Sequence, residues 1–276
     1  MSHRILVGIL ACGENEKSDA IAALKAQTYS DWDFFLIEDK PNKQAHEELY
    51  DRFAQSKLQY DLFLKLDADT VFIRTSALQE ISDLFHATPD IVGAGIDLID
   101  FYSNSLIPSL AVATGGVEWP RHTDNLLVDS YTRATGRILR VSDERKAVAV
   151  HSPNPSPLQA FRFGVHRALK AVQRDRTPQA RFRHKANLQW KVLCKVWENF
   201  KIAQDRRLGL AIAGAEYVFS TEGSGYQFDY MHPLIADEFA SRYQALTTPE
   251  LLRTLSPQWN DLESNALRWS VLLDAP

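Results

Sequence analysis

Two aspartates at the end of an apolar segment are the side chains of this sequence best placed to do chemistry. The segment Leu64-Lys65-Leu66 leads directly into Asp67-Ala68-Asp69-Thr70. In an extended backbone, residues two apart point to the same side, so the two carboxylates can act together. Mg²⁺ and Mn²⁺ prefer oxygen ligands, and such a pair leaves positions open for diphosphate oxygens. A solvated turn is the alternative, because Asp is common where strands end.

Short apolar runs alternate with helical patterns in the first part of the chain, and these elements must position the carboxylates. We expect strands at 5–11, 33–37, 60–66 and 91–97, and helices at 18–27, 43–55 and 76–86. Strands that are apolar on both faces and are followed by helices indicate a mostly parallel central sheet flanked by helices. The predicted fold class is therefore α/β, of the nucleotide-binding type.

Ligands of such sheets bind beyond the carboxyl ends of the strands. The polar residues expected there are Cys12 and Glu14 after the first strand, Asp39 after the second, and Asp67 and Asp69 after the third. The sequence has no Gly-X-Gly-X-X-Gly after the first strand and no Gly-Lys-Ser/Thr motif. If phosphate binds at this edge, a divalent metal held by carboxylates is the natural group to neutralise it.

The segment from Ala22 to Asp39 adds a resemblance to a known family. It contains Gln27-Thr28-Tyr29 before a strand that ends in Glu38-Asp39, and it resembles the opening of family 2 glycosyltransferases of the GT-A fold. The resemblance implies that Asp39 contacts the base of a nucleotide and that Asp67-Ala68-Asp69 is the family's Asp-X-Asp motif for metal and diphosphate. The residues assigned to the nucleotide are Cys12, Glu14, Asp39 and Asp67.

The resemblance continues downstream of Gly115-Gly116. The segment His122-Thr123-Asp124 looks like the family's segment in which an acid opens a helix, which implies that Asp124 is the catalytic base. Thr123 stands where the family usually has Glu, and His122 and Asp129 are alternatives for that role. The residues assigned to the acceptor side are Gly115, Gly116 and Trp119, although Trp119 could equally close an edge of the core.

The run Ala147 to His151 resembles the strand whose final histidine completes the metal site in many members of the family. The alternative for His151 is a local hydrogen bond at a strand end. The metal residues implied by the resemblance are Asp67, Asp69 and His151, with Mn²⁺ or Mg²⁺ as the cofactor.

The resemblance covers about residues 4–151 and implies a metal-dependent, inverting glycosyltransferase of polysaccharide biosynthesis. Asp124 would deprotonate a hydroxyl of a glycan or lipid-linked acceptor, and a metal on Asp69 would stabilise the diphosphate that leaves the nucleotide-diphosphate sugar donor. One alternative is a sugar nucleotidyltransferase, although the segment after the first strand is acidic rather than basic. A catalytically silent glycan- or nucleotide-binding module is the other alternative.

Charge is distributed unevenly along the chain. The net charge is -4, yet residues 162–207 hold thirteen Lys and Arg against three acidic residues, a local balance of +10 that leaves -14 for the rest. We expect a catalytic domain over residues 1–152 and a helical basic segment with a C-terminal tail over 153–276. Residues 162–207 are expected to form a solvated helical face or a surface for anionic lipid or lipid diphosphate. Nucleic acid is disfavoured, because the whole chain is acidic and has no recognised binding motif.

The compartment follows from cysteine usage and hydropathy. Cys12 and Cys194 lie far apart in the chain, which does not indicate a disulfide scaffold. No apolar run approaches the roughly 20 residues that span a bilayer, and residues 5–11 are interpreted as a buried strand rather than as a signal segment. We therefore expect a cytoplasmic protein, with peripheral contact at the inner face of the membrane if the basic segment binds lipid.

Overall fold

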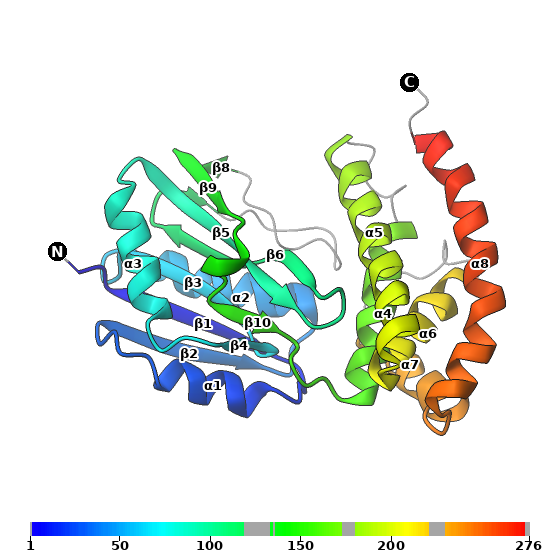
Figure 1. Cartoon of the computed structure of the whole chain (residues 1–276). Helices are drawn as coiled ribbons and strands as arrows, with labels where there is room; N and C mark the ends of the chain where they lie inside the picture. The colour runs from blue at the N-terminus through cyan, green and yellow to red at the C-terminus, as the bar shows by residue number, and fades with distance from the viewer. Residues whose placement is uncertain (1, 119–132, 135, 173–179, 221–229, 274–276) are drawn as a thin grey trace. The chain divides into compact units, whose positions relative to one another are not determined.

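The structure is a computed structural model that describes residues 2–118, 133–134, 136–172, 180–220 and 230–273. The chain divides into two compact units, Met1–Pro155 and Ser156–Pro276, whose elements are labelled in Figure 1. The first unit is built around a sheet, and the described part of the second unit is helical.

An eight-stranded sheet forms the centre of the first unit, in the order β2-β1-β3-β6-β5-β10-β4, with β9 paired to β5. The strands are β1 (Ile5–Ala11), β2 (Trp32–Glu38), β3 (Leu62–Asp67), β4 (Thr70–Phe72), β5 (Ile91–Asp100), β6 (Ser105–Thr114), β9 (Arg137–Val141) and β10 (Ala149–His151). The helices of this unit are α1 (Lys17–Lys25), α2 (Asn42–Gln55) and α3 (Ala77–Ala87), with a short 3-10 turn at Glu144–Lys146. A separate pair joins β7 (Val117–Glu118) to β8 (Arg133–Ala134).

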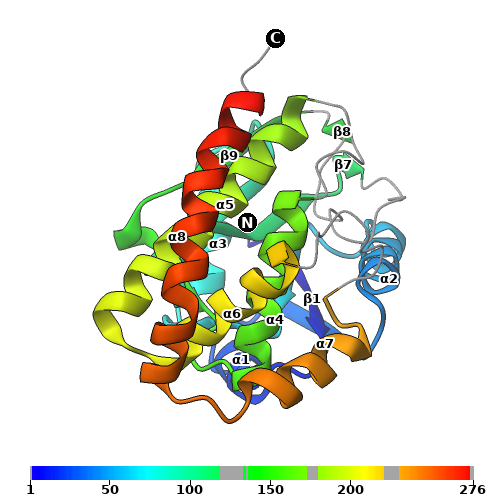
Figure 2. The same cartoon turned by 90° about the vertical axis from the view of Figure 1, so that its right-hand side faces the viewer.

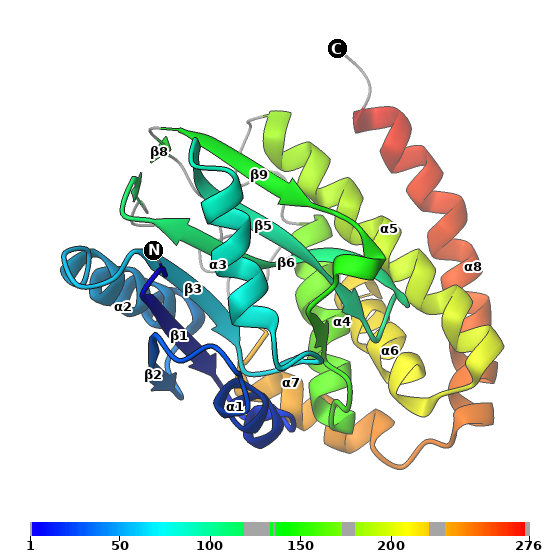
Figure 3. The ribbon, with the colours of Figure 1, turned by 60° about the vertical axis from the view of Figure 1, so that its left-hand side comes forward.

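Alternation along β1 explains why both faces of the sheet are covered. Ile5, Val7 and Ile9 belong to the core cluster that α1 and α3 complete with residues such as Leu24 and Leu78. Leu6 and Leu10 point to the other face, where α2 contributes Leu49 and Phe53. Figure 3 shows α3 over one face and α2 on the other. Because side chains on both faces of β1 are removed from water, both faces contribute to the stability of the fold.

Gly8 lies on β1 where side chains of α2 and β2 pack against the strand. A Cβ atom at position 8 would lie 2.2 Å from Cδ1 of Leu49 and 2.9 Å from Cζ of Phe35. Glycine at this position therefore allows the close contact between helix and strand.

The predicted α/β fold with a mostly parallel sheet is confirmed. The pairs β1–β2, β1–β3, β5–β9 and β5–β10 are parallel, and the helices and strands expected up to residue 97 are present with small shifts of their ends. Strand β6 is an addition to the expected elements; it runs antiparallel between β3 and β5 in the middle of the sheet.

Helices make up the described part of the second unit, as expected for this half of the chain. They are α4 (Pro157–Val172), α5 (Ala180–Ala203), α6 (Arg206–Ser220), α7 (Pro233–Glu238), a π-helical turn at Phe239–Tyr243, and α8 (Thr248–Leu273). Helix α6 is almost wholly buried and contacts α4, α5 and α8; Figure 2 looks onto this unit.

Two glycines let α4 and α6 touch through their backbones. A Cβ on Gly164 of α4 would lie 1.7 Å from the carbonyl oxygen of Ala211, and a Cβ on Gly214 of α6 would lie 2.0 Å from that of Phe161. Any side chain at either position would force the helices apart. The aromatic rings of Trp190, Trp197 and Trp259 pack against one another beside this pair, with Trp190 and Trp259 stacked at 5.3 Å.

Candidate functional site

The segment Asp67-Ala68-Asp69 links two strands at the carboxyl edge of the sheet. β3 ends at Asp67 and β4 starts at Thr70, while the backbone N–H of Ala68 donates to the carbonyl oxygen of Leu10 on β1. Because β4 pairs antiparallel with β10, Thr70 lies opposite His151. This register brings the third-strand carboxylates next to a histidine that follows them by about eighty residues in the chain.

Asp69 and His151 are in direct contact. Nε2 of His151 lies 3.3 Å from Oδ2 of Asp69, and Nδ1 of His151 lies 2.7 Å from Oδ1 of Asp100. Ser152 Oγ donates to Oδ2 of Asp69 at 2.9 Å, and the Ser152 backbone N–H donates to the Asp69 carbonyl oxygen. Ser152 is buried and has a φ of 48°, a left-handed conformation that costs a non-glycine residue energy. The chain thus holds a strained residue in place to fix Asp69.

The protonation states of this pair follow from its surroundings. Burial disfavours the charged form of His151, but the charge of Asp69 and hydrogen bonds to Asp100 and Asp69 outweigh it and raise the pKa of His151 to about 10. Burial also opposes ionisation of Asp69, yet the charge of His151 and hydrogen bonds from His151 and Ser152 lower the pKa of Asp69 to about 2. Without a metal, the two groups form an ion pair at neutral pH.

Asp67 is paired with a buried lysine. Nζ of Lys65 donates to Oδ2 of Asp67 at 3.0 Å, and the side chain of Lys65 is 9% exposed against 36% for that of Asp67. Residues 65 and 67 share a face of β3, which brings the charges together. Sequence reasoning missed Lys65, although a lysine inside an apolar strand, two residues before a carboxylate, was a signal that could have identified it.

Cys12 and Glu14 follow β1 at the same edge. The backbone N–H of Cys12 donates to Oε2 of Glu14 at 2.6 Å, and its thiol Sγ lies 2.9 Å from Oε1. Burial raises the pKa of Glu14, with a further upward contribution from the charge of Asp69, while the hydrogen bonds from Cys12 partly oppose the shift. The charge of Asp69 therefore reaches Glu14, which places the two carboxyl groups in one electrostatic environment.

Asp39 follows β2 at this edge and is exposed to solvent. Its φ is 53°, a left-handed conformation that Asp tolerates better than most residues, and its backbone N–H donates to the carbonyl oxygen of Ala11. The neighbouring Glu38 pairs with Lys17 at 2.7 Å. The structure thus places Cys12, Glu14, Asp39, Asp67 and Asp69 after the adjacent strands β1, β2 and β3, and it brings His151 of β10 into contact with Asp69.

Other expected site residues do not join this group in the described structure. Gly115 and Gly116 follow β6, whose last residue, Thr114, pairs with Leu62 at the start of β3. They therefore lie at the amino edge of β3, opposite the edge that carries Asp67 and Asp69. Asp124 and Trp119, with the alternatives His122 and Asp129, lie outside the described residues.

The side chains at the carboxyl edge fit a divalent metal in part. Oδ1 of Asp69 is buried and has no hydrogen-bond partner within the described ranges, and a carboxylate oxygen beside an imidazole nitrogen is a ligand set that divalent metals accept. Across the part of the chain that the structure describes, no group of three or more His, Cys, Asp and Glu side chains is arranged to hold a metal ion. Asp69 and His151 are in contact and present two candidate ligands, and Oδ2 of Asp67 accepts from Lys65.

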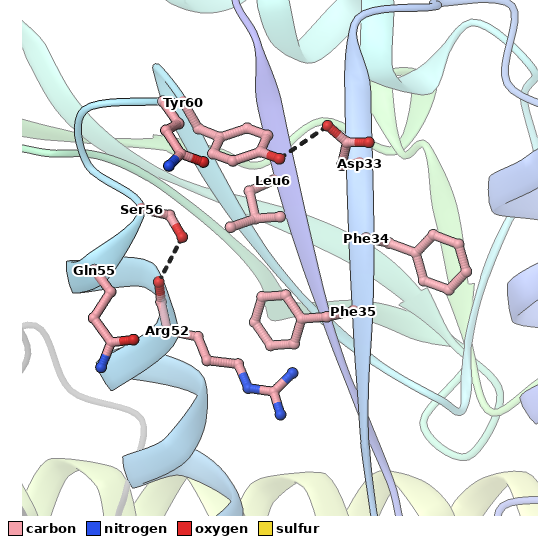
Figure 4. A pocket seen from close by; sticks show the side chains of 9 residues that line it. Leu6, Asp33, Phe34, Phe35, Arg52, Gln55, Ser56 and Tyr60 are labelled. Carbon is pink, nitrogen blue, oxygen red and sulfur yellow. Dashed lines mark hydrogen bonds between the residues drawn. The ribbon is translucent and has the colours of Figure 1, made fainter.

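A shallow pocket lies at the other end of the first strands. Figure 4 shows it between β2 and α2, with the hydroxyl of Tyr60 donating to Asp33. Its charged groups are already paired: Asp33 also accepts from Arg4, and Arg52 donates to Glu48. This arrangement serves the packing of the helix on the sheet, and it contains none of the expected site residues. The lining residues are Leu6, Asp33, Phe34, Phe35, Arg52, Gln55, Ser56, Gln59 and Tyr60.

Part of the basic charge of the second unit is used inside that unit. Arg167 donates to Gln189 and lies over the ring of Phe163, and Arg206 donates to the carbonyl oxygens of Gln244 and Leu246. Lys191 and Lys195, in contrast, are exposed on α5. None of the described helices has the length and apolar character needed to cross a membrane.

Comparisons with known proteins found similar solved structures, at low identity and with TM-scores below 0.5. Neither a protein-family model nor a curated protein sequence matches it. The mannosyltransferase PcManGT from Pyrobaculum calidifontis, solved with GDP-Man and Mn²⁺, is similar over 97% of this chain and 87% of its own, at 12% identity and a TM-score of 0.40.

Two further solved structures are similar over parts of the chain. TarS of S. aureus is similar over 85% of this chain and 50% of its own, at 11% identity and a TM-score of 0.37, so the match spans half the length of TarS. A glycosyltransferase involved in glycosylation of the major capsid of PBCV-1 is similar over 54% of this chain and 94% of its own, at 13% identity and a TM-score of 0.36.

Proposed function

We propose that this chain is a metal-dependent glycosyltransferase that transfers a sugar, with inversion, from a nucleotide-diphosphate sugar to a hydroxyl of a glycan or lipid-linked acceptor. The observation that carries the proposal is the contact between Asp69 and His151 at the carboxyl edge of the sheet, with one oxygen of Asp69 buried and unpartnered among the described residues. The resemblance of residues 22–39 and 67–69 to family 2 glycosyltransferases supports this interpretation of the contact.

The contacts support the proposed roles at the metal end. Asp69 and His151 would hold Mn²⁺ or Mg²⁺, which would supply Lewis-acid stabilisation of the diphosphate as it leaves. Lys65 offsets the charge of Asp67, which makes the same edge less repulsive to an anionic ligand. Cys12, Glu14, Asp39 and Asp67 are assigned to the nucleotide, and Asp39 would contact its base.

The acceptor side is proposed from the resemblance. Asp124 would accept the proton of the attacking hydroxyl, because an alcohol attacks a sugar carbon faster as its proton leaves. Gly115, Gly116 and Trp119 are assigned to the same side. We further propose a cytoplasmic location, peripheral to the membrane if the acceptor is lipid-linked.

A thermal-shift panel tests the donor site. Nucleoside diphosphates and their sugars are added with Mn²⁺ or with a chelator, and we expect one nucleotide to raise the melting temperature only when metal is present. A ligand at about 100 times its dissociation constant stabilises the native state by about 2.7 kcal/mol. Asp69→Asn should abolish the shift, whereas Asp83→Asn, a change of the same kind at an exposed position of α3, should retain it.

Turnover separates the proposed enzyme from its alternatives. The unmodified chain with the stabilising donor and a suitable acceptor should release nucleoside diphosphate, and Asp124→Asn should bind the donor but lose transfer. Full transfer by Asp124→Asn would contradict the role of that residue as base. Donor binding without any release would indicate a binding module, and formation of a nucleotide sugar from a nucleoside triphosphate would indicate a nucleotidyltransferase.

A further inference from the structure

A second buried carboxylate stands behind the histidine of the site. Asp100 is the last residue of β5 and pairs in register with His151 of the neighbouring strand β10. Its side chain is 0% exposed, and Oδ1 lies 2.7 Å from Nδ1 of His151. Neither the Asp-X-Asp motif nor the resemblance assigns a role to this residue.

Ser103 fixes the orientation of this carboxylate. Oδ2 of Asp100 accepts from the backbone N–H of Ser103 at 2.7 Å and from its hydroxyl at 2.6 Å. Ser103 Oγ in turn accepts from the hydroxyl of Ser105 at 2.9 Å, so its own proton is free to go to Asp100. Two donors on Oδ2 favour the ionised carboxylate, which can only accept hydrogen bonds.

An acceptor at Oδ1 determines which nitrogen of His151 carries a proton. Nδ1 must be the donor toward Asp100, so Nε2, whose proton pairs with Asp69 in the metal-free chain, is the nitrogen that offers a lone pair once a metal displaces that proton. Carboxylates that orient metal-binding histidines in this way usually affect metal affinity by about 10-fold to 100-fold.

We propose that Asp100 is a positioning residue that holds His151 with Nδ1 protonated and Nε2 directed to the metal held with Asp69. The inference rests on the proposed metal site and names a residue that acts through His151 without touching the substrate. A residue that only linked β5 to β10 could use any polar contact with His151. The proposed role of Asp100 requires a hydrogen-bond acceptor at the Oδ1 position.

Asp100→Asn tests this requirement with little change of shape. The backbone N–H of Ser103 still needs an acceptor, so the amide oxygen takes the place of Oδ2 and the amide nitrogen faces Nδ1 of His151. Nδ1 must then accept, which moves the proton of the neutral ring to Nε2. We expect Mn²⁺ affinity, measured by titration with electron paramagnetic resonance, to fall about 10-fold to 100-fold.

Asp97→Asn is the matched control. Asp97 lies on the same strand, its side chain is 1% exposed, and it pairs with Arg140 of β9 at 2.9 Å rather than with His151. This variant should lose stability yet bind Mn²⁺ like the unmodified chain. Melting temperatures of both variants separate loss of folding from loss of metal.

Ser103→Ala is a second variant in case Asp100→Asn does not fold. It removes the hydroxyl donor and leaves the backbone donor, so it should weaken Mn²⁺ binding by up to about fivefold, since one hydrogen bond contributes about 1 kcal/mol. Unchanged Mn²⁺ affinity in both site variants, or an equal loss in Asp97→Asn, would overturn the role of Asp100 and leave the metal site standing. An unmodified chain that binds no Mn²⁺ would overturn the metal site and this inference with it.

Discussion

Single ionisable side chains set the character of the carboxyl edge of the sheet. Both carboxylates of the Asp-X-Asp motif have a cationic partner inside the protein. Asp67 is paired with Lys65, and Asp69 is paired with His151. The edge is therefore less negative than its count of acidic residues indicates. Such internal pairing keeps buried carboxylates ionised until a stronger cation competes for them.

The ion pair of His151 with Asp69 predicts how the stability of the metal-free chain depends on pH. The pKa of His151 is raised from 6.5 to about 10, so its contribution is full below pH 6.5 and is lost as pH rises through about 10. The pKa of Asp69 is lowered from 3.8 to about 2, so its contribution is full above pH 3.8 and is lost as pH falls through about 2.

Urea unfolding of the chelator-treated protein between pH 6 and pH 10 measures the alkaline limb. We expect the free energy of unfolding to fall across this range in the unmodified chain and to stay flatter in His151→Gln, which cannot be protonated. A variant as steep as the unmodified chain would contradict the prediction.

We expect Lys65→Met to change the affinities for metal and for anion in opposite directions. Removing the buried positive charge makes the edge more negative, so Mn²⁺ should bind more tightly, by about threefold to tenfold if the lost repulsion is about 1 kcal/mol. The stabilising nucleoside diphosphate should bind less tightly in the same variant. Lys25→Met, which removes an exposed lysine in the last turn of α1, is the control and should change neither affinity measurably.

The contact between helices α4 and α6 depends on glycine, so a substitution there tests the packing of these two elements. Gly164→Ala places a methyl group against the backbone of Ala211 in the helix pair α4–α6, where no side chain can move aside. We expect a loss of about 3 kcal/mol in unfolding free energy, at the upper end of overpacking costs. Gly95→Ala on β5 is the control, because a Cβ there meets nothing within 4 Å. Equal stabilities of the two variants would rule out backbone contact between the helices.

The sequence predicted the elements that repeat a simple pattern and missed those that depend on distant partners. Strand β6 carries Pro108, which disfavours a strand in sequence analysis; in the fold it lies opposite Asp97, where the β5–β6 register shifts. Helix α6 carries Gly209 and Gly214, which weaken a helical pattern, yet Gly214 is there for the contact with α4.

Some residues of the candidate site could be predicted from the sequence, and others depend on distant partners. Asp67 and Asp69 could be identified because chain order alone places them at a strand end. Asp100 could not, since it and Asp97 both occupy the apolar strand β5, and only the pairing of β5 with β10 distinguishes their roles. Ser152 was missed for the same reason, because its partner Asp69 lies far away in the sequence.

The uneven charge of the whole molecule predicts a salt-sensitive interaction with anionic membranes. Of the described basic residues between 162 and 207, Lys191, Lys195 and Lys201 are exposed on α5. We expect the chain to float with vesicles that contain anionic lipid at low salt and to detach at high salt.

Charge reversal shows whether the location of the charge matters. Each lysine near an anionic surface contributes about 1 kcal/mol, so Lys191→Glu with Lys195→Glu should weaken vesicle binding by at least about tenfold. Lys25→Glu with Lys146→Glu changes the net charge equally on exposed positions of the first unit and should weaken it less. Equal effects would show that only net charge matters, and no binding at low salt would remove the membrane interaction.

The hydrogen bonds of Asn154 tie the chain to the loop after β1, just before the boundary between the two units. Nδ2 of Asn15 donates to the carbonyl oxygen of Asn154, and the backbone N–H of Asn154 donates to Glu16, so the chain is tied to the loop after β1 immediately after it leaves Ser152. The boundary between the units lies at Pro155 and Ser156. A different C-terminal unit joined at Ser156 would inherit Asp69, His151 and their supports already assembled. The described contacts of Asp69 and His151 with Asp100 and Ser152 therefore all lie within one continuous stretch of chain before Pro155.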